Sequence, residues 1–427
     1  MKRAREEIRL LRQGEIIKNA ASLYGATIVT SIFGFAYWFV AAHLAPATAV
    51  GTASAVQSAA VFFAIFCVLG VSTLVLSELA IDRSVARTLL LTAMALVGVF
   101  SAIVAVGGGI VLRLGSHSLR PGLATPFELI VFAALVAFST VTLVADDACI
   151  GLLRGDIQLR RNTVFAIVKL AVLPLFLWLW PERSGLEMVL AWLFGLMVSF
   201  GVVTVALAKI TEDQRWRLNF RMLASKRRLM AGHHWLNVSI QSPRLIISVL
   251  VATIISPAAN AAYTAAYLMV SFINIIPFHL STVLFALSPG DESALRREVK
   301  KTMRLCGGLA LVTAPLFVIF SNLGLRLFGS AYTIATPAMI ILGLTTFPLA
   351  VKNHYVAIAR VRGQMARASI LTLIGAAFEV GLAAAGAVNF GLTGVALGYL
   401  AALVIEALLF GPTVLRVVRA KPVDSVE

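Results

Sequence analysis

Charged side chains are scarce in this chain of 427 residues. They occupy 13% of the positions, whereas hydrophobic side chains occupy 59%. In soluble globular domains about a quarter of the residues are charged. The composition therefore excludes a water-soluble fold and favours a chain that lies largely inside a lipid bilayer.

Cysteine is rare as well, with three residues, Cys67, Cys149 and Cys306. Each lies in an apolar segment, and their spacing matches neither a disulfide framework nor a metal site. We interpret them as small packing residues. The glycine run at 107–109 also lies in an apolar segment, and no phosphate-loop Lys follows it. With neither paired catalytic acids nor a nucleophile elbow, the sequence predicts no enzymatic activity, no cofactor and no metal.

Long apolar runs dominate the rest of the chain. Inside hydrocarbon, backbone N–H and C=O groups must bond within their own segment, so runs of this length are expected to form helices. We predict an all-α polytopic membrane protein with about twelve transmembrane helices. The expected spans are 20–43, 49–77, 88–112, 127–152, 162–181, 186–208, 235–256, 262–288, 303–328, 331–358, 367–388 and 391–415.

The basic residues are distributed unevenly between the two sets of loops. The net charge is +16, and the loops of one side hold almost all of the Lys and Arg residues that lie outside the spans. The loops of the other side hold only Arg113, Arg120, Arg183 and Arg326. Because Lys and Arg accumulate on the cytoplasmic side, we predict a bacterial inner-membrane protein with both termini in the cytoplasm. The same bias explains the positive charge without nucleic acid.

The segment before the first span is charged, and that span is longer than a signal-peptide core. We therefore expect the N-terminus to remain as a cytoplasmic tail. The longest hydrophilic stretch is 211–234, which is rich in Arg and Lys. We interpret it as a basic cytoplasmic linker between an N-terminal lobe, 1–210, and a C-terminal lobe, 235–427. It forms either an amphipathic helix on the anionic leaflet or a solvated connector.

Four short segments recur in the same order at nearly the same offset. The pairs are Ser72-Thr73-Leu74 with Ser281-Thr282-Val283, Ala45-Pro46-Ala47 with Ser256-Pro257-Ala258, Leu112-Arg113-Leu114 with Leu325-Arg326-Leu327, and Arg154-Gly155-Asp156 with Arg362-Gly363-Gln364. Such repeats in a membrane chain indicate duplicated helix bundles. Because each half has an even number of spans, we expect two six-helix lobes related by a pseudo-twofold axis along the membrane normal, with a cleft between them.

With these features, the sequence resembles the polysaccharide and oligosaccharide flippases of the multidrug/oligosaccharidyl-lipid/polysaccharide exporter superfamily. The resemblance covers nearly the whole chain and rests on Lys18-Asn19-Ala20-Ala21, Leu69-Gly70-Val71-Ser72, Phe328-Gly329-Ser330-Ala331-Tyr332 and Gly391-Leu392-Thr393-Gly394-Val395-Ala396. It implies alternating access by two lobes and a lipid-diphosphate-linked glycan as cargo, without ATP hydrolysis. One departure is that many relatives have Arg, an apolar residue and Asp in span seven, whereas this chain has Arg244-Leu245-Ile246.

Three cations lie well inside the expected spans: Lys169, Arg244 and Lys352. Ionisable groups at this depth cost free energy, so those retained usually face a cavity or a partner. Arg clasps phosphate oxygens with two donors and Lys acts as a point charge, so a shared cationic cleft would suit a diphosphate cargo. The alternative for Lys169 and Lys352 is that the side chains extend to the membrane interface. Arg244 is deepest and follows Ser242 and Pro243, which favours a cavity wall.

Candidate acids for ion coupling are Asp146, Asp147 and Glu379. Adjacent residues on a helix point about 100° apart, so Asp146 and Asp147 are expected to face different surroundings. Glu379 lies in the middle of its span without a local partner, and is either a proton or sodium ligand or part of an interhelical pair. Glu78 and Glu406 lie nearer to span ends and are interpreted as interfacial.

The sequence thus favours a flippase that moves an isoprenoid-diphosphate-linked oligosaccharide to the outer leaflet for surface polysaccharide assembly. Membrane lipids and the glycan cargo are its expected partners, with polymerase or assembly proteins as further candidates. A cation-coupled drug or metabolite exporter of the same fold is the first alternative, and it would need an acidic, aromatic-lined cavity in the N-terminal lobe. The second is a membrane-embedded glycosyltransferase or polysaccharide polymerase, which would need a large outer loop or a cluster of catalytic acids, whereas the outer loops here are short. A non-transporting component of a glycan-assembly complex is a further alternative.

Overall fold

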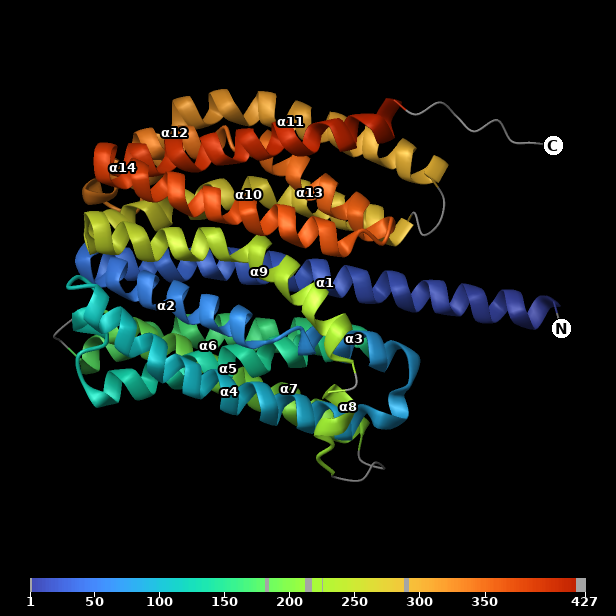
Figure 1. The fold of residues 1–427 in the computed structure, drawn as a ribbon. Helices are drawn as coiled ribbons and strands as arrows, with labels where there is room; N and C mark the ends of the chain where they lie inside the picture. The colour runs from blue at the N-terminus through green and yellow to red at the C-terminus, as the bar shows by residue number, and fades with distance from the viewer. Residues whose placement is uncertain (1, 181–183, 212–216, 225, 288–291, 420–427) are drawn as a thin grey trace. The chain divides into compact units, whose positions relative to one another are not determined.

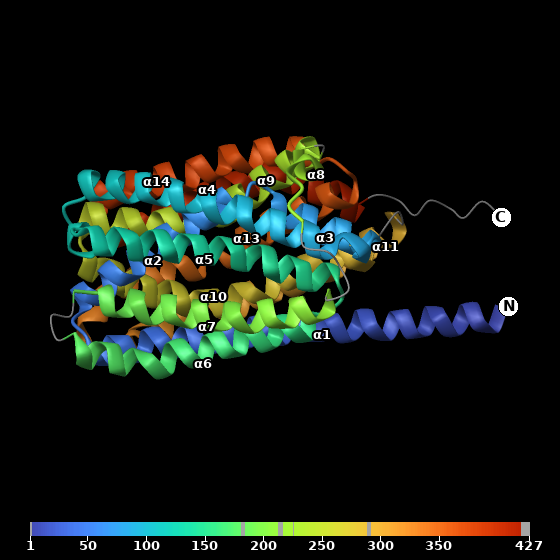
Figure 2. The same ribbon diagram turned by 90° about the horizontal axis from the view of Figure 1, so that it is seen from below.

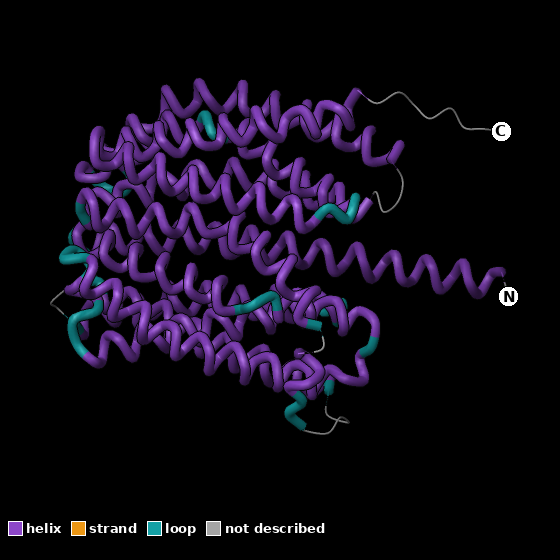
Figure 3. The backbone as a smooth tube through the Cα atoms, in the orientation of Figure 1, coloured by secondary structure: helices purple, strands orange, loops and turns teal. Residues whose placement is uncertain are grey.

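A computed structural model describes residues 2–180, 184–211, 217–224, 226–287 and 292–419 of the chain (Figure 1). In this part of the chain the regular structure is entirely helical, with short connections between the helices (Figure 3). The chain divides into two compact units, Met1–His234 and Trp235–Glu427.

The first unit contains seven long or medium helices and one short one. They are α1 (Lys2–Leu44), α2 (Ala47–Cys67), α3 (Val71–Ile81), α4 (Ala86–Gly115), α5 (Pro126–Gly151), α6 (Gly155–Leu179), α7 (Leu186–Ile210) and α8 (Phe220–Ala224). Figure 2 shows α1, α6 and α7 running side by side, and these helices contact one another as neighbours. Helix α9 (Arg227–Leu250) begins inside the expected linker and continues into the second unit.

The second unit continues from α9 through a π-helical turn, η3 (Val251–Ile255). Its further elements are α10 (Pro257–Leu287), α11 (Glu292–Arg326), the 3₁₀ turn η4 (Ser330–Ala335), α12 (Thr336–Gly343), α13 (Thr346–Val361) and α14 (Met365–Arg419). Helix α14 is 55 residues long and loses helical geometry at Phe390 and Gly391, so it consists of two arms.

The helices confirm the prediction of an all-α polytopic membrane fold. In the described ranges, ten helices are long and apolar enough to cross a membrane. An eleventh crossing arises if Ser330–Gly343 and Thr346–Val361, which meet at 48°, form one bent span. The break in α14 supplies the twelfth, because each arm corresponds to one expected span.

The outer surface carries many large apolar side chains, as a protein in lipid requires. Leu311 is 79% exposed, Trp178 77% and Leu408 72%. A soluble protein rarely presents this much contiguous apolar surface to water. The exposed side chains therefore support a membrane location independently of the hydropathy of the sequence.

Glycine marks two of the places where helices break. The break between α2 and α3 lies at Leu69 and Gly70, both of which have positive φ. Gly70 has a φ of 71° and lies against the backbone carbonyl of Met230, where a Cβ would overlap. Gly391, with a φ of 57°, occupies the break in α14. Residues with a Cβ are disfavoured at positive φ, so glycine permits both breaks.

The two arms of α14 pack unusually closely because small residues face each other. A Cβ on Gly386 would overlap the backbone of Gly394, and a Cβ on Gly398 would overlap that of Leu382. The arms therefore form an antiparallel hairpin with backbone-to-backbone contact, as small residues allow between membrane helices. This register decides which side chains of the two arms meet deeper in the unit.

Candidate functional site

Lys169 lies inside a cage of three aromatic rings in the first unit. Its ammonium is 3.6 Å from the centre of the Trp192 ring, 4.4 Å from that of Phe165 and 5.4 Å from that of Tyr37. Phe165 and Lys169 are on α6, Trp192 is on α7 and Tyr37 is on α1. We call these three rings the aromatic cage. An ammonium over an aromatic face is attracted by the ring quadrupole, by about 2 kcal/mol when desolvated.

Local packing fixes the aromatic cage. The Tyr37 hydroxyl donates a hydrogen bond of 2.6 Å to the carbonyl oxygen of Met188. The rings of Tyr37 and Phe165 each meet Trp192 edge to face, at 5.2 and 5.4 Å between centres. Gly195 lets α7 approach the backbone of α6 beside Lys169, since a Cβ there would lie 2.9 Å from the Lys169 Cβ.

Lys169 is buried, and no described residue serves as its counter-ion. Its exposed fraction is 2%, and within the described residues it has neither a hydrogen bond nor an ion pair. The side chain therefore does not extend to the membrane interface. A cation held by aromatic faces alone keeps its hydrogen-bond donors available to an anion that reaches it. Lys169 is the one predicted cation that lies in the first unit, since Arg244 and Lys352 belong to the second.

Asp146 and Asp147 have different partners, as their angular separation on α5 predicts. Asp146 Oδ2 accepts a hydrogen bond of 2.6 Å from an Nη2 of Arg161, which also donates to the side-chain oxygen of Asn162. Asp147 instead lies near Ser72 on α3, and within the described residues it forms no ion pair. The Asp146–Arg161 pair is nearly buried, with 17% and 5% of the side chains exposed. It links the α5–α6 hairpin and has the geometry of a structural ion pair.

The second unit contains a buried group of one lysine and two glutamates. Lys352 of α13 forms ion pairs with Glu379 on the first arm of α14 and with Glu406 on the second. The ammonium lies 2.9 Å from Glu406 Oε2, and each of the three side chains is 3% exposed. We call Lys352, Glu379 and Glu406 the lysine–glutamate triad.

The residues around the lysine–glutamate triad leave space for its buried side chains. Gly375 leaves the space that the Glu406 carboxyl occupies, because a Cβ at this position would overlap that carboxyl. Three tyrosines lie within electrostatic reach of Glu379: Tyr263 and Tyr399, which are buried, and Tyr267, which is partly buried. The Tyr263 hydroxyl has no hydrogen-bond partner in the part of the chain that is described. The triad thus lies in a small polar region inside an otherwise apolar bundle.

Arg244 is exposed on α9, between the buried residues Pro243 and Leu245. Its guanidinium lies within electrostatic reach of Tyr267. Among the residues that the structure describes, Arg244 takes part in no hydrogen bond or ion pair. The structure therefore places Arg244 outside the lysine–glutamate triad.

The structure brings together some of the predicted residues and separates others. Lys352 and Glu379 contact each other, so the interhelical pair considered for Glu379 is present. The ammonium of Lys352 is neutralised by carboxylates, which corrects its interpretation as a cation offered to cargo or extended to the interface. The interfacial interpretation of Glu406 is also wrong, because this side chain is buried in the triad. The glycines at 386, 394 and 398 were a signal in the sequence for close packing of the two arms of α14. The register of that hairpin could have placed Glu406 opposite Gly375.

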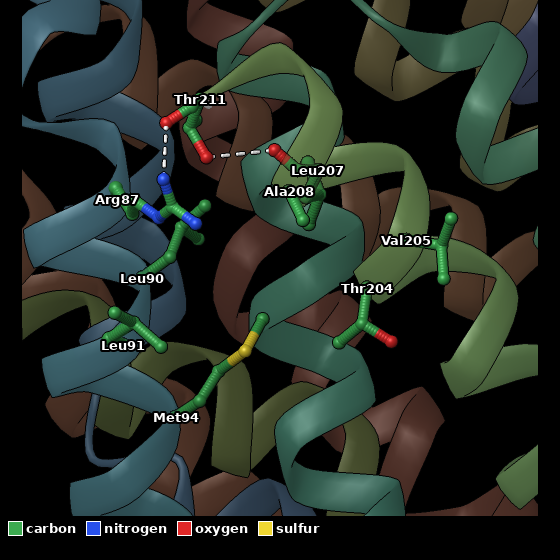
Figure 4. A pocket seen from close by; sticks show the side chains of 9 residues that line it. All are labelled: Arg87, Leu90, Leu91, Met94, Thr204, Val205, Leu207, Ala208 and Thr211. Atoms are coloured by element: carbon green, nitrogen blue, oxygen red, sulfur yellow. Dashed lines mark hydrogen bonds between the residues drawn. The ribbon is translucent and has the colours of Figure 1, made fainter. Parts of the chain in front are cut away.

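A separate groove lies between α4 and α7 of the first unit (Figure 4). Its volume is about 280 Å³, and apart from the rim its walls are mostly apolar. At the rim, Arg87 donates a hydrogen bond of 3.1 Å to the carbonyl oxygen of Thr211, which ends α7. The lining residues are Arg87, Leu90, Leu91, Met94, Thr204, Val205, Leu207, Ala208 and Thr211. This groove contains none of the predicted site residues.

No protein-family model matches the chain, and no curated protein matches it either. Solved structures match over almost the full length. An inward-facing multidrug resistance MATE family transporter of the MOP superfamily is 14% identical, with a TM-score of 0.71 over 92% of this chain and 96% of that chain. A MOP superfamily transporter from Pyrococcus furiosus, described as having a binding pocket of reverse polarity, is 15% identical, with a TM-score of 0.66 over 94% and 96%.

A Vibrio cholerae MATE transporter is likewise similar, with 16% identity and a TM-score of 0.61 over 96% of this chain and 97% of that chain. All three solved structures are of transporters. The chain therefore has the two-lobed, all-helical fold of the MATE family transporters of the MOP superfamily. At this level of identity the likeness concerns the fold alone.

Proposed function

We propose that the chain is a membrane transporter that works by alternating access. We further propose that its cargo is an isoprenoid-diphosphate-linked oligosaccharide, moved from the cytoplasmic to the outer leaflet of a bacterial inner membrane for surface polysaccharide assembly. The fold supports the transporter class, since the similar solved structures are MATE family and MOP superfamily transporters.

One observation carries the choice of cargo. Lys169 is a deeply buried cation of the first unit that has no counter-ion among the described residues. Two acids of the same unit are already bound: Asp146 pairs with Arg161, and Glu187 accepts hydrogen bonds from the backbone N–H groups of Ser184 and Gly185. An exporter of cationic drugs needs an available acid against an aromatic wall. Here the aromatic wall holds an ammonium, which repels organic cations and attracts a phosphate. A diphosphate headgroup fits this sign of charge.

A cation-coupled exporter of drugs or metabolites is the second candidate. It is favoured by the lysine–glutamate triad, in which buried carboxylates outnumber the ammonium. It is also favoured by the multidrug resistance transporter among the similar structures. The two candidates differ in cargo rather than in fold.

The deciding experiment measures the amount and sidedness of isoprenoid-linked oligosaccharide in membranes of a strain that lacks this protein. Accumulation on the cytoplasmic face, reversed by the wild-type gene, is the expected result. Normal sidedness combined with increased sensitivity to cationic drugs would overturn the flippase proposal in favour of the exporter. Unchanged sidedness and unchanged drug sensitivity would indicate a non-transporting component of a glycan-assembly complex.

A further inference from the structure

The lysine–glutamate triad has more negative than positive charge. Glu379 and Glu406 supply two carboxyl groups and Lys352 supplies one ammonium, with 3% of each side chain exposed. If every group is ionised, a net charge of −1 is buried in the hydrocarbon region, which is costly. One additional positive charge would make the site neutral.

The described surroundings supply no second cation to Glu406. The charged groups within electrostatic reach of Glu406 are Lys352 and Glu379. Those within reach of Lys352 are the two glutamates alone. The other titratable groups facing the triad are the phenols of Tyr263 and Tyr267 on α10 and of Tyr399 on α14, and Arg244 lies beyond Tyr267. A proton from solution is the remaining source of positive charge within this part of the chain.

The two carboxyl groups also meet at a single ammonium, since Lys352 contacts Glu379 and both side-chain oxygens of Glu406. A hydrogen bond between two carboxyl groups requires that one of them carries a proton, because an ionised carboxylate has no donor. Two carboxyl groups held side by side share a single proton, because like charges so close together do not both ionise. The arrangement of the carboxyl groups and the charge balance therefore both indicate one proton on the pair Glu379 and Glu406.

We propose that Glu379 and Glu406 form a proton-binding site in which they share one exchangeable proton, and that Lys352 occupies the place of a metal cation and excludes sodium. As the driving ion of transport this site rests on the proposed function, but its occupancy is independent of any cargo. The ammonium already binds oxygens of both carboxylates, at 2.9 and 3.2 Å from Glu406. A sodium ion would lose these oxygens as ligands and would be repelled by the ammonium.

The position of the two glutamates gives proton binding a mechanical consequence. Glu379 is on the first arm of α14 and Glu406 on the second, with the break at Phe390 and Gly391 between them. A shared proton ties the arms together through a hydrogen bond. Loss of the proton leaves two like charges on facing arms, with one ammonium between them, and weakens their packing. The state of the proton thus selects between a tight and a loose hairpin.

The site can be tested on the purified full-length protein in lipid nanodiscs by infrared difference spectroscopy during a pH titration. Wild type should show the C=O stretch of a protonated, buried carboxyl that disappears on deprotonation. Glu406→Gln should lack this band, because Glu379 and Lys352 then form a neutral pair. The matched control is Glu292→Gln, since Glu292 pairs with Arg362 at the surface, and it should keep the band. Absence of the band in wild type at every pH at which the protein is folded would overturn the proposal.

Sodium exclusion has its own test, thermal unfolding of the same protein in sodium chloride against choline chloride of equal ionic strength. Wild type should unfold at the same temperature in both salts. Lys352→Ala should become more stable as sodium increases, because the vacated space between the carboxylates then binds the ion. Sodium-dependent stabilisation of wild type would overturn the proposal, and this measurement decides the question even if Lys352→Ala does not fold. Neither experiment involves cargo, so failure here is distinct from failure of the flippase assignment.

Discussion

Two buried lysines, Lys169 and Lys352, have opposite electrostatic surroundings. Lys352 is held by two carboxylates, whereas Lys169 is held by three aromatic rings without a described counter-ion. Removal of Lys352 leaves two unbalanced acids, but removal of Lys169 leaves an apolar cage that another apolar side chain can fill. The two residues should therefore respond differently to the same substitution.

Lys169→Met tests the role of the aromatic cage. Methionine is of similar length and apolar, so we expect the protein level and thermal stability to stay near those of wild type. Glycan export, measured as isoprenoid-linked oligosaccharide in the outer leaflet, should fall by at least tenfold because the phosphate loses its cation. Lys209→Met, at the exposed end of α7, is the control and should export normally. Normal export by Lys169→Met would remove this lysine from the cargo site.

Gly375→Ala tests the packing of Glu406. The added Cβ would overlap the Glu406 carboxyl, so we expect a loss of about 1–3 kcal/mol in the free energy of unfolding. Gly381→Ala lies on the same arm with no atom near its Cβ, and should be neutral or stabilising by up to about 1 kcal/mol. Thermal unfolding of both variants in detergent checks the difference. Equal melting temperatures would contradict the described register of the two arms.

At the level of helices and hairpins, the α5–α6 hairpin offers two Arg–Asp pairs that differ in burial. Arg161 and Asp146 are nearly buried, whereas Arg154 and Asp156 are about half exposed. Breaking one side of a buried pair leaves an uncompensated charge, whereas an exposed pair exchanges its partner for water.

We therefore expect Arg161→Met to lower the stability by about 3–5 kcal/mol. Arg154→Met should lower it by less than about 1 kcal/mol. Thermal unfolding of the purified variants measures both. The double variant Arg161→Met with Asp146→Leu should recover most of the loss, because no charge is then left without a partner. A double variant as unstable as Arg161→Met alone would mean that the pair does more than balance charge.

Sequence patterns predicted the positions of the helices better than the contacts between side chains of different helices. The break in α14 was predictable, because spans 367–388 and 391–415 meet at the glycine that breaks the helix. The partnership of Glu379 with Lys352 was not, since hydropathy says nothing about which faces of two helices meet. Glu406 was assigned to the interface from its position near the end of a span. Its helix instead continues to Arg419, and the hairpin register places Glu406 inside.

On the scale of the whole molecule, length and hydropathy were sufficient for the fold, because hydrocarbon requires every backbone group to bond within its helix. The two-lobed fold followed from the repeats and agrees with the similar solved structures. The cargo could not be predicted in the same way. The proposed cargo site depends on Lys169, whose surroundings come from three separate helices.

Orientation in the membrane is a testable property of the whole chain. The charge bias predicts that Arg83, in the turn between α3 and α4, is cytoplasmic and that Arg120, between α4 and α5, is extracytoplasmic. Both residues are exposed. A membrane-impermeant maleimide should therefore label Arg120→Cys in intact cells and Arg83→Cys only in inverted vesicles. The three native cysteines are buried and should stay unlabelled in both. The opposite labelling pattern would mean that the chain is inverted.

The surplus carboxylate of the triad also has an evolutionary consequence. One glutamate is enough to neutralise Lys352, so a descendant could replace Glu379 or Glu406 by a neutral residue and keep the buried charges balanced. Loss of the lysine first, by contrast, would leave two carboxylates without their described counter-ion. If the triad served stability alone, mutation would remove one acid first and leave a lysine–glutamate pair. Lineages that keep both acids are then those in which selection acts on the proton itself.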